Sequence, residues 1–246
     1  MNFKRTQSLI VGVVLLLLST SVQAQTDHEN KVVSLQLGDK VVLIPTPTGY
    51  EEVTAEFENL KARFAATEPP QNELLLAYLT TSDYTLLKSG KPPALQQYAK
   101  IAVVRQTKEV SMSREEFAVV ADYLRNNTGK ILDPKSPELQ KLFQEFGQHV
   151  SKELSTDFKT APTETAVLGT FNDKPNIYSS MITSTLKREL NGKTTFFPVL
   201  GTVSILHIKT RMISVATYRG YKSEADVEEL KTFTINWTNT ILAANK

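Results

Sequence analysis

The sequence predicts an α+β fold, a largely antiparallel β-sheet covered by helices, as a single domain after an N-terminal signal peptide. Two patterns support this class. Apolar residues recur at helical spacing in several segments, whereas residues 165–221 are rich in β-branched residues and turn signals. The chain has 246 residues, and removal of residues 1–24 leaves 222, which is enough for one well-packed domain. We therefore expect one α+β domain over residues 32–246.

Residues 1–24 resemble a secretory signal peptide. Lys4 and Arg5 precede ten residues, 9–18, that are apolar except for one glycine, and Val22-Gln23-Ala24 fits a cleavage site. A membrane-spanning helix needs about 20 apolar residues, so we expect no transmembrane segment in the mature chain. Residues 25–31 form a polar leader. The sequence thus predicts export to the periplasm or the extracellular space.

Composition excludes several kinds of chemistry. The chain contains no cysteine, which excludes thiol catalysis and thiolate metal sites. The signal holds two of the 28 basic residues and none of the 26 acidic ones, so the mature chain has no formal net charge. This balance gives no reason to expect nucleic acid as a partner.

The first elements after the leader are a hairpin and a helix. Residues 32–37 and 40–44 alternate as strands around a turn at Gly38-Asp39, and Pro45 ends the hairpin. A helix is expected over residues 50–66, with Glu51 and Glu52 in its first turn, where the helix dipole favours anions. Its apolar stripe consists of Val53, Phe57, Leu60 and Phe64.

Two strands and two helices follow. The apolar runs 74–79 and 98–104 predict strands, and Pro92-Pro93 favours a loop over the uncertain residues 82–94. Ser113 begins a capping box for a helix that Asn126-Asn127-Thr128-Gly129 should end. Ser136-Pro137 starts a second helix, whose core face carries Leu139, Leu142, Phe143, Phe146, Val150 and Leu154.

The meander of residues 165–221 is divided by turn signals. Asn191-Gly192 is the strongest, because both residues tolerate the positive φ of a type I′ turn, and residues 172–175 and 209–210 give two more. Residues 177–190 fit either a strand or a helix, and their serines and threonines favour the strand. A closing helix over residues 223–245 carries Trp237 on its buried stripe.

The segment Ile44-Pro45-Thr46-Pro47-Thr48-Gly49-Tyr50, set between an early hairpin and a helix, resembles the Mog1/PsbP-like α/β/α sandwich group. In that group a strand running into proline and then a glycine–aromatic pair is common near the start. The resemblance implies a binding or accessory protein rather than an enzyme. It carries no functional residues over to this chain.

No catalytic motif is present in the sequence. Its three histidines, His28, His149 and His207, are not within helical reach of one another, so we expect no metal site and no cofactor. Glu52 and Glu56 are four residues apart in the expected helix, as an acid–base or cation site requires. A solvated helix face explains them more simply.

The strongest functional signal is a basic excess in residues 186–222, which hold one acid, Glu189, and seven basic residues: Lys187, Arg188, Lys193, Lys209, Arg211, Arg219 and Lys222. Arg211 and Arg219 share a strand face but lie roughly 26 Å apart, too far to hold one small anion. Both are expected on a polar face that tolerates substitution. The candidate ligand-binding residues are Lys209, Arg211, Tyr218, Arg219 and Tyr221, the tyrosines lining a pocket edge or capping the core.

These observations favour an exported non-enzymatic binding or accessory protein, with an anionic ligand or a protein as its partner. One alternative is an extracytoplasmic enzyme with a carboxylate or Tyr/Arg site. Another is a partner-binding module anchored by an uncleaved signal. The sequence leaves open the ligand, the oligomeric state and whether the host is bacterial or eukaryotic.

Overall fold

The computed structural model describes residues 31–69, 71–131, 158–190 and 192–246. Between residues 132 and 157 it describes only positions 133, 135, 137, 140, 141, 144, 145, 148, 151 and 152. The predicted signal peptide and residues 25–30 of the leader lie outside the described residues. So do His28, His149 and the core residues expected for the helix after Ser136.

Among the described elements, three strands precede the first helix, and four consecutive strands precede the last helix. The strands are β1 (Val32–Leu37), β2 (Lys40–Pro45), β3 (Tyr50–Glu52), β4 (Asn72–Thr80), β5 (Gln97–Val104), β6 (Phe158–Lys174), β7 (Ile177–Leu190), β8 (Lys193–Ile208) and β9 (Arg211–Gly220). The helices are α1 (Glu58–Ala66), α2 (Thr81–Lys88), α3 (Arg114–Ile131) and α5 (Glu224–Ala244), with a short 3₁₀ turn, η2 (Arg105–Thr107).

The described strands form one large sheet and one small one, both antiparallel. The large sheet has the order β3-β4-β5-β9-β8-β7-β6, and β1 and β2 pair separately. The predicted α+β class and single domain are confirmed. Among the described helices, none is long and apolar enough to cross a membrane.

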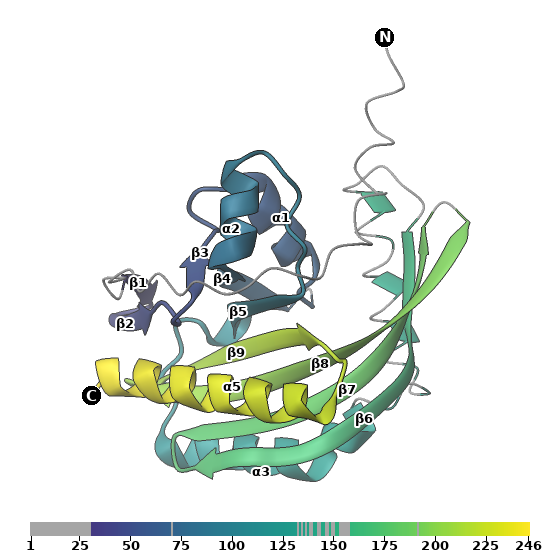
Figure 1. Ribbon diagram of the computed structural model, residues 1–246. Helices are drawn as coiled ribbons and strands as arrows, with labels where there is room; N and C mark the ends of the chain where they lie inside the picture. Colours follow the sequence, from purple (N-terminus) through teal and green to yellow (C-terminus); the bar gives the residue numbers. More distant parts are fainter. Residues whose placement is uncertain are drawn as a thin grey trace.

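Helices lie on both faces of the large sheet (Figure 1). α5 packs across β8 and β9, where Trp237 and Ile241 join a core with Ile101, Leu206 and Val215. On the opposite face, α1 and α2 pack on β4, and Phe117 of α3 packs against residues of β7 and β8. The first face is called the α5 face below, and the second the α1/α3 face.

The predicted four-stranded meander is confirmed, but the turn expected at residues 172–175 lies at Pro175-Asn176, because Asp173 and Lys174 still pair with β7. Residues 177–190 form a strand, β7, because they pair with β6 on one side and with β8 on the other. Leu190 pairs with Lys193, which is the register expected on either side of the predicted hairpin turn. Ile208 pairs with Arg211, and Lys209 and Thr210 between them both have positive φ, as a type I′ turn requires.

Two expectations are wrong in part: the helix expected over residues 50–66 is confined to α1, and residues 82–88 of the stretch expected as loop are helical in α2. Residues 50–52 form β3, an edge strand paired with β4, so Glu51 and Glu52 do not stand in a helix. Glu52 instead accepts hydrogen bonds from the backbone N–H and the hydroxyl of Thr54. Residues 81–88 form α2, because the hydroxyl of Thr80 caps its N-terminus by accepting from the N–H of Asp83.

Helix α3 continues past its predicted end. The side chains of Asn126 and Asn127 donate to the carbonyls four residues earlier, and the Thr128 hydroxyl does the same. These residues thus satisfy their own polar groups within the helix rather than ending it, and the helix runs to Ile131. Hydrogen bonds from these side chains to carbonyls within the helix therefore replace the turn that the sequence predicted.

The segment from Pro45 to Tyr50 fixes the chain between the two sheets. The Trp237 indole N–H donates to the Pro45 carbonyl at 2.8 Å, and the Tyr50 N–H donates to the Pro47 carbonyl at 3.1 Å. Gly49 has a φ of +80°, which this turn needs and most side chains resist. The segment from Pro45 to Tyr50 is therefore a structural turn that the Trp237 side chain of α5 holds in place.

Candidate functional site

The predicted site residue Arg211 is an internal clamp rather than a free cation. It is 3% exposed, although a solvent-facing position was expected from the polarity of the strand. Its guanidinium donates to the Leu37 carbonyl at 2.9 Å and to the Ser111 hydroxyl at 2.8 Å, and it pairs with Asp39. These bonds join the β1–β2 hairpin to the start of β9. The position therefore cannot tolerate substitution as the sequence suggested.

Arg219, at the other end of β9, is also neutralised within the molecule. It pairs with Asp226 at 2.8 Å and with Glu229 at 2.5 Å, both on α5. Backbone N–H groups, first that of Lys222, together with the Arg219 guanidinium hold the pKa of Asp226 below its ordinary value. The arginine therefore helps to fix the start of α5 on the sheet.

The remaining predicted residues do not gather into one site. The Lys209 ammonium donates to the Val41 carbonyl at 3.0 Å, at the β8–β9 turn. The Tyr221 hydroxyl donates to Glu224, and this bond raises the pKa of Tyr221. Tyr218 alone lies toward the middle of the sheet, on the α1/α3 face. The five predicted residues therefore lie apart: Lys209 at the β8–β9 turn, Arg211 and Arg219 in ion pairs at opposite ends of β9, Tyr221 near the start of α5, and Tyr218 on the sheet.

Tyr218 lies beside a part of the α1/α3 face that remains exposed. Strand register places Val167, Ile182, Gly201 and Tyr218 in one row across β6, β7, β8 and β9. The neighbouring row contains Val203 and Ala216. We call these six residues the open strip: Val167, Ile182, Gly201, Val203, Ala216 and Tyr218.

The open strip exposes apolar side chains on the interior strand β8 and on the edge strand β6. Val203 of β8 is 40% exposed although β7 and β9 flank it on both sides, and Val167 of β6 is 38% exposed. Gly201 and Ala216, the small residues of the strip, lie beside Tyr218 and Ile182 in the register. A Cβ built on Gly201 would lie 3.5 Å from both of these side chains, which is ordinary contact.

The α1 side of the strip is an aromatic and ionic wall. Tyr218 stacks on Tyr98 of β5 with ring centroids 4.7 Å apart, and burial raises the pKa of both tyrosines. The Lys100 ammonium lies 5.3 Å from the Tyr218 ring centroid and pairs with Glu68 at 2.6 Å. Lys100 and Glu68 are both nearly buried, and the Thr67 hydroxyl accepts a further bond from Lys100. The wall carries no uncompensated charge.

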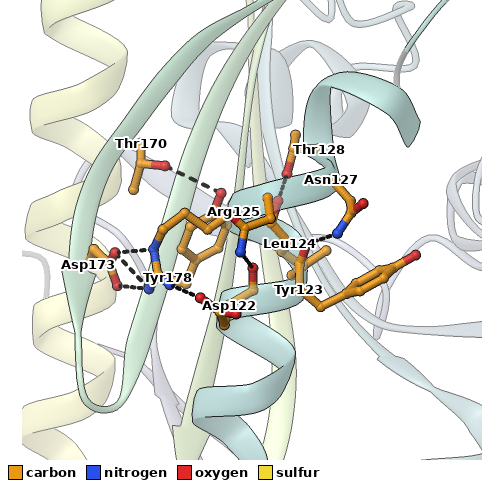
Figure 2. A network of polar contacts seen from close by, with 10 residues as sticks. Asp122, Tyr123, Leu124, Arg125, Asn127, Thr128, Thr170, Asp173 and Tyr178 are labelled. Carbon is orange, nitrogen blue, oxygen red and sulfur yellow. Dashed lines mark hydrogen bonds and ion pairs between the residues drawn. The ribbon is translucent and has the colours of Figure 1, made fainter.

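The α3 side of the strip is a polar network centred on Arg125 (Figure 2). Its guanidinium binds both carboxylate oxygens of Asp173, at 2.9 and 3.1 Å, and also Asp122 of its own helix. The Asp173 bonds raise the pKa of Arg125. Arg125 lies 6.0 Å from the Tyr178 ring centroid, and the Tyr178 hydroxyl accepts a bond from Thr170. This network fastens α3 to β6 and β7.

Residues weighed for acid–base or metal chemistry have structural partners. Glu56 binds the Tyr84 hydroxyl and Lys88, and these bonds lower its pKa. His207 bonds to the Met112 carbonyl through Nε2 at 2.7 Å and packs against Phe117. Within the described part of the chain, no three His, Asp or Glu side chains lie together as a metal site requires.

Sequence reasoning named Tyr218 but missed the rest of the open strip. Val203 stands in an apolar stretch that predicts burial on both faces. Its exposure depends on where α1 and α3 come to lie, and no local pattern in β8 indicates that.

No known protein family matches this chain, and no curated protein matches it. Among solved structures it is similar to the Ran-binding protein Mog1p of Saccharomyces cerevisiae, with 9% sequence identity and a TM-score of 0.32, over 88% of this chain and 93% of that one. The resemblance to the Mog1/PsbP-like group thus extends to a weak similarity of structure. At this score it carries no argument about function.

Proposed function

We propose that this is an exported, non-enzymatic binding or accessory protein whose open strip holds an apolar segment of a protein partner. The observation that carries the proposal is the 40% exposure of Val203 in an interior strand of the sheet. Export rests on the signal-like residues 1–24.

The energetic argument concerns the two faces of β8. On the α5 face, Leu206 and Leu200 are fully buried by the packing of α5. On the α1/α3 face, Val203 and Val167 keep apolar surface in water. Full burial of a valine side chain is worth about 1.5–3 kcal/mol, so a partner that covers both gains a useful part of its binding energy there.

The size of the strip fits a segment of a protein. Val167 and Tyr218 are separated by three strand spacings, which is about 14 Å. An α-helix with its side chains is about 10–12 Å across. The α1 side of the strip is neutral, because Lys100 pairs with Glu68, and the α3 side carries one net negative charge, because Arg125 faces both Asp122 and Asp173. The exposed valines between them favour a partner segment that is apolar at its centre.

The alternative functions have weaker support. The enzyme hypothesis needs reactive carboxylate, tyrosine or arginine groups, yet Arg219, Tyr221 and Glu56 are engaged in ion pairs and hydrogen bonds within the fold. The anchored-module hypothesis concerns residues 1–24, which lie outside the described residues. Intact mass of the protein recovered from its host tests it: a mature chain should begin at Gln25, and retention of residues 1–24 would favour the anchor.

Site-specific photo-crosslinking tests the open strip. A photoreactive residue at position 203 should give a discrete crosslinked product in the native host, and one at position 119, on the exposed side of α3, should not. Adding Ala216→Glu, directly opposite Val203 in the register, should abolish that product without lowering the melting temperature by more than a few degrees. The same product at both positions, or a product unaffected by Ala216→Glu, would overturn the proposal.

A further inference from the structure

Leu95, in the loop between α2 and β5, has a backbone conformation that leucine does not favour. Its φ is +54°, in the left-handed region where the Cβ of most residues comes too close to the neighbouring carbonyl oxygen. The other described residues with positive φ, apart from glycines, are Lys209 and Thr210, which form a two-residue hairpin turn. Leu95 belongs to no such turn, so contacts from outside the loop must hold it in this conformation.

The carboxylate of Asp83 supplies those contacts. Asp83 lies in the first turn of α2 and is 4% exposed. One of its oxygens accepts from the N–H of Ala94 at 2.8 Å, and the other accepts from the N–H of Leu95 at 3.1 Å. The Gln96 carbonyl accepts from the N–H of Gly220 at 2.9 Å. The chain around Leu95 is therefore fixed to α2 on one side and to β9 on the other.

The Leu95 side chain gains little stability from this arrangement, because it is 40% exposed. Glycine or asparagine adopts positive φ more readily than leucine and places no apolar side chain in water. A buried carboxylate thus holds a leucine in an unfavourable conformation and leaves part of its side chain in solvent. Residues held in this way are concentrated at binding and active sites.

Leu95 borders the open strip on its α1 side. Tyr98, three residues after Leu95, pairs with Tyr218 of the strip, and three residues of chain span at most about 11 Å. Helix α2, which holds the Leu95 N–H, packs on β4 on the α1/α3 face. Gln96 lies over the same face, because a Cβ built on Gly220, which shares a face of β9 with Tyr218, would be 3.0 Å from the Gln96 Oε1.

We propose that Leu95 is a second contact for the protein partner of the open strip, and that Asp83 holds it in place for that contact. This inference rests on the proposed function. Val203 and Tyr98 are two strand spacings and two residues apart, which is about 12 Å, so Leu95 lies at most about 23 Å from Val203. An apolar partner segment of about four helical turns reaches both contacts.

Thermal melts separate a contact residue from a packing residue. Leu95→Asn removes the leucine side chain and suits the positive φ, so the melting temperature should stay within about 2 °C of the unmodified protein or exceed it. Leu87→Asn, the same change at a partly buried position of α2, is the control and should lower it by about 5 °C or more. Equal losses in the two variants would overturn the inference, because Leu95 would then serve the packing of the fold.

Crosslinking in the native host, with the photoreactive residue at position 203, tests the contact itself. Leu95→Asn should lower the yield of the crosslinked product about fivefold, because the partner then has no leucine side chain to cover. Val119→Asn, at an exposed position of α3, should leave the yield unchanged. A photoreactive residue at position 95 should give a product with the same partner as one at position 203.

The outcomes distinguish this inference from the proposed function. A product at position 203 that Leu95→Asn leaves unchanged, or a different partner at position 95, would overturn the inference and leave the open strip as the binding site. Absence of a product at position 203 in the otherwise unmodified protein would overturn the proposed function, and the role of Leu95 with it.

Discussion

The two faces of β8 reverse the usual relation between polarity and burial. On the α5 face, Thr202 and Ser204 are fully buried, whereas the intervening Val203 on the α1/α3 face is exposed. The buried hydroxyls are satisfied: Thr202, Thr217 and Thr234 form a triangle with oxygen distances of 2.6, 3.0 and 2.9 Å. Ser204 pairs with Ser179 at 2.7 Å. Helix cover, rather than residue type, thus decides burial in this strand.

The largest loss of stability is expected from a change in helix α5, which covers the α5 face of the sheet. Trp237→Ala should lower the free energy of unfolding by about 3–5 kcal/mol, because it leaves a cavity beside Tyr78 and removes the bond to the Pro45 carbonyl. Urea unfolding followed by circular dichroism measures the change. Tyr123→Ala, at an exposed position of α3, is the control and should stay within about 0.5 kcal/mol. Comparable losses in the two variants would contradict a sealed α5 face.

The second effect concerns the clamp that joins the hairpin to β9. Arg211→Met should cost about 3 kcal/mol, since it removes charge-assisted bonds to the buried Leu37 carbonyl and to Ser111. Arg219→Met, whose partner Glu229 is largely exposed, should cost about 1 kcal/mol. Chemical denaturation of both variants gives the difference. A larger loss for Arg219→Met would mean that the hairpin contributes little to stability.

A third, smaller effect tests the buried hydroxyl triangle. Thr202→Val should cost about 1 kcal/mol, because Thr217 and Thr234 still bond to each other. The triple variant, with valine at all three positions, should cost less than the sum of the three single changes, since no unpaired hydroxyl then remains buried. Urea unfolding of the four variants measures the coupling. An additive or greater loss in the triple variant would show that the hydroxyls stabilise the core independently.

The smallest effect is expected on the open strip. Val203→Ser should change the free energy of unfolding by no more than about 0.5 kcal/mol, because the side chain already meets water. The matched change on the opposite face, Val215→Ser, replaces a fully buried valine and should cost at least about 2 kcal/mol. Parallel thermal and urea melts compare the two. Equal costs would mean that the strip is covered in solution.

Local sequence determined most of the strands and helices, although residues 50–52 form β3 rather than the start of the expected helix. The Asn191-Gly192 signal correctly predicted that Leu190 and Lys193 pair. Lys209 and Thr210 both have positive φ although neither residue type favours it, so the pairing of Ile208 with Arg211 sets that turn. The periodic apolar stripe of α5 placed Trp237 in the core, where it is 3% exposed. Where local signals competed, prediction failed: α2 begins at a threonine cap in a stretch expected to be loop, and α3 absorbs Asn126 and Asn127.

Only the tertiary structure decided the roles of the charged and exposed residues. The partners of Arg211 are 100 and more residues away in the chain, at Leu37, Asp39 and Ser111, so no local pattern could show that it is buried. The exposure of Val203 likewise depends on helices α1 and α3, which stop short of the middle of the sheet. Sequence periodicity determines which side chains share a face of a strand. Whether that face meets a helix or water depends on long-range packing, which is what creates the open strip.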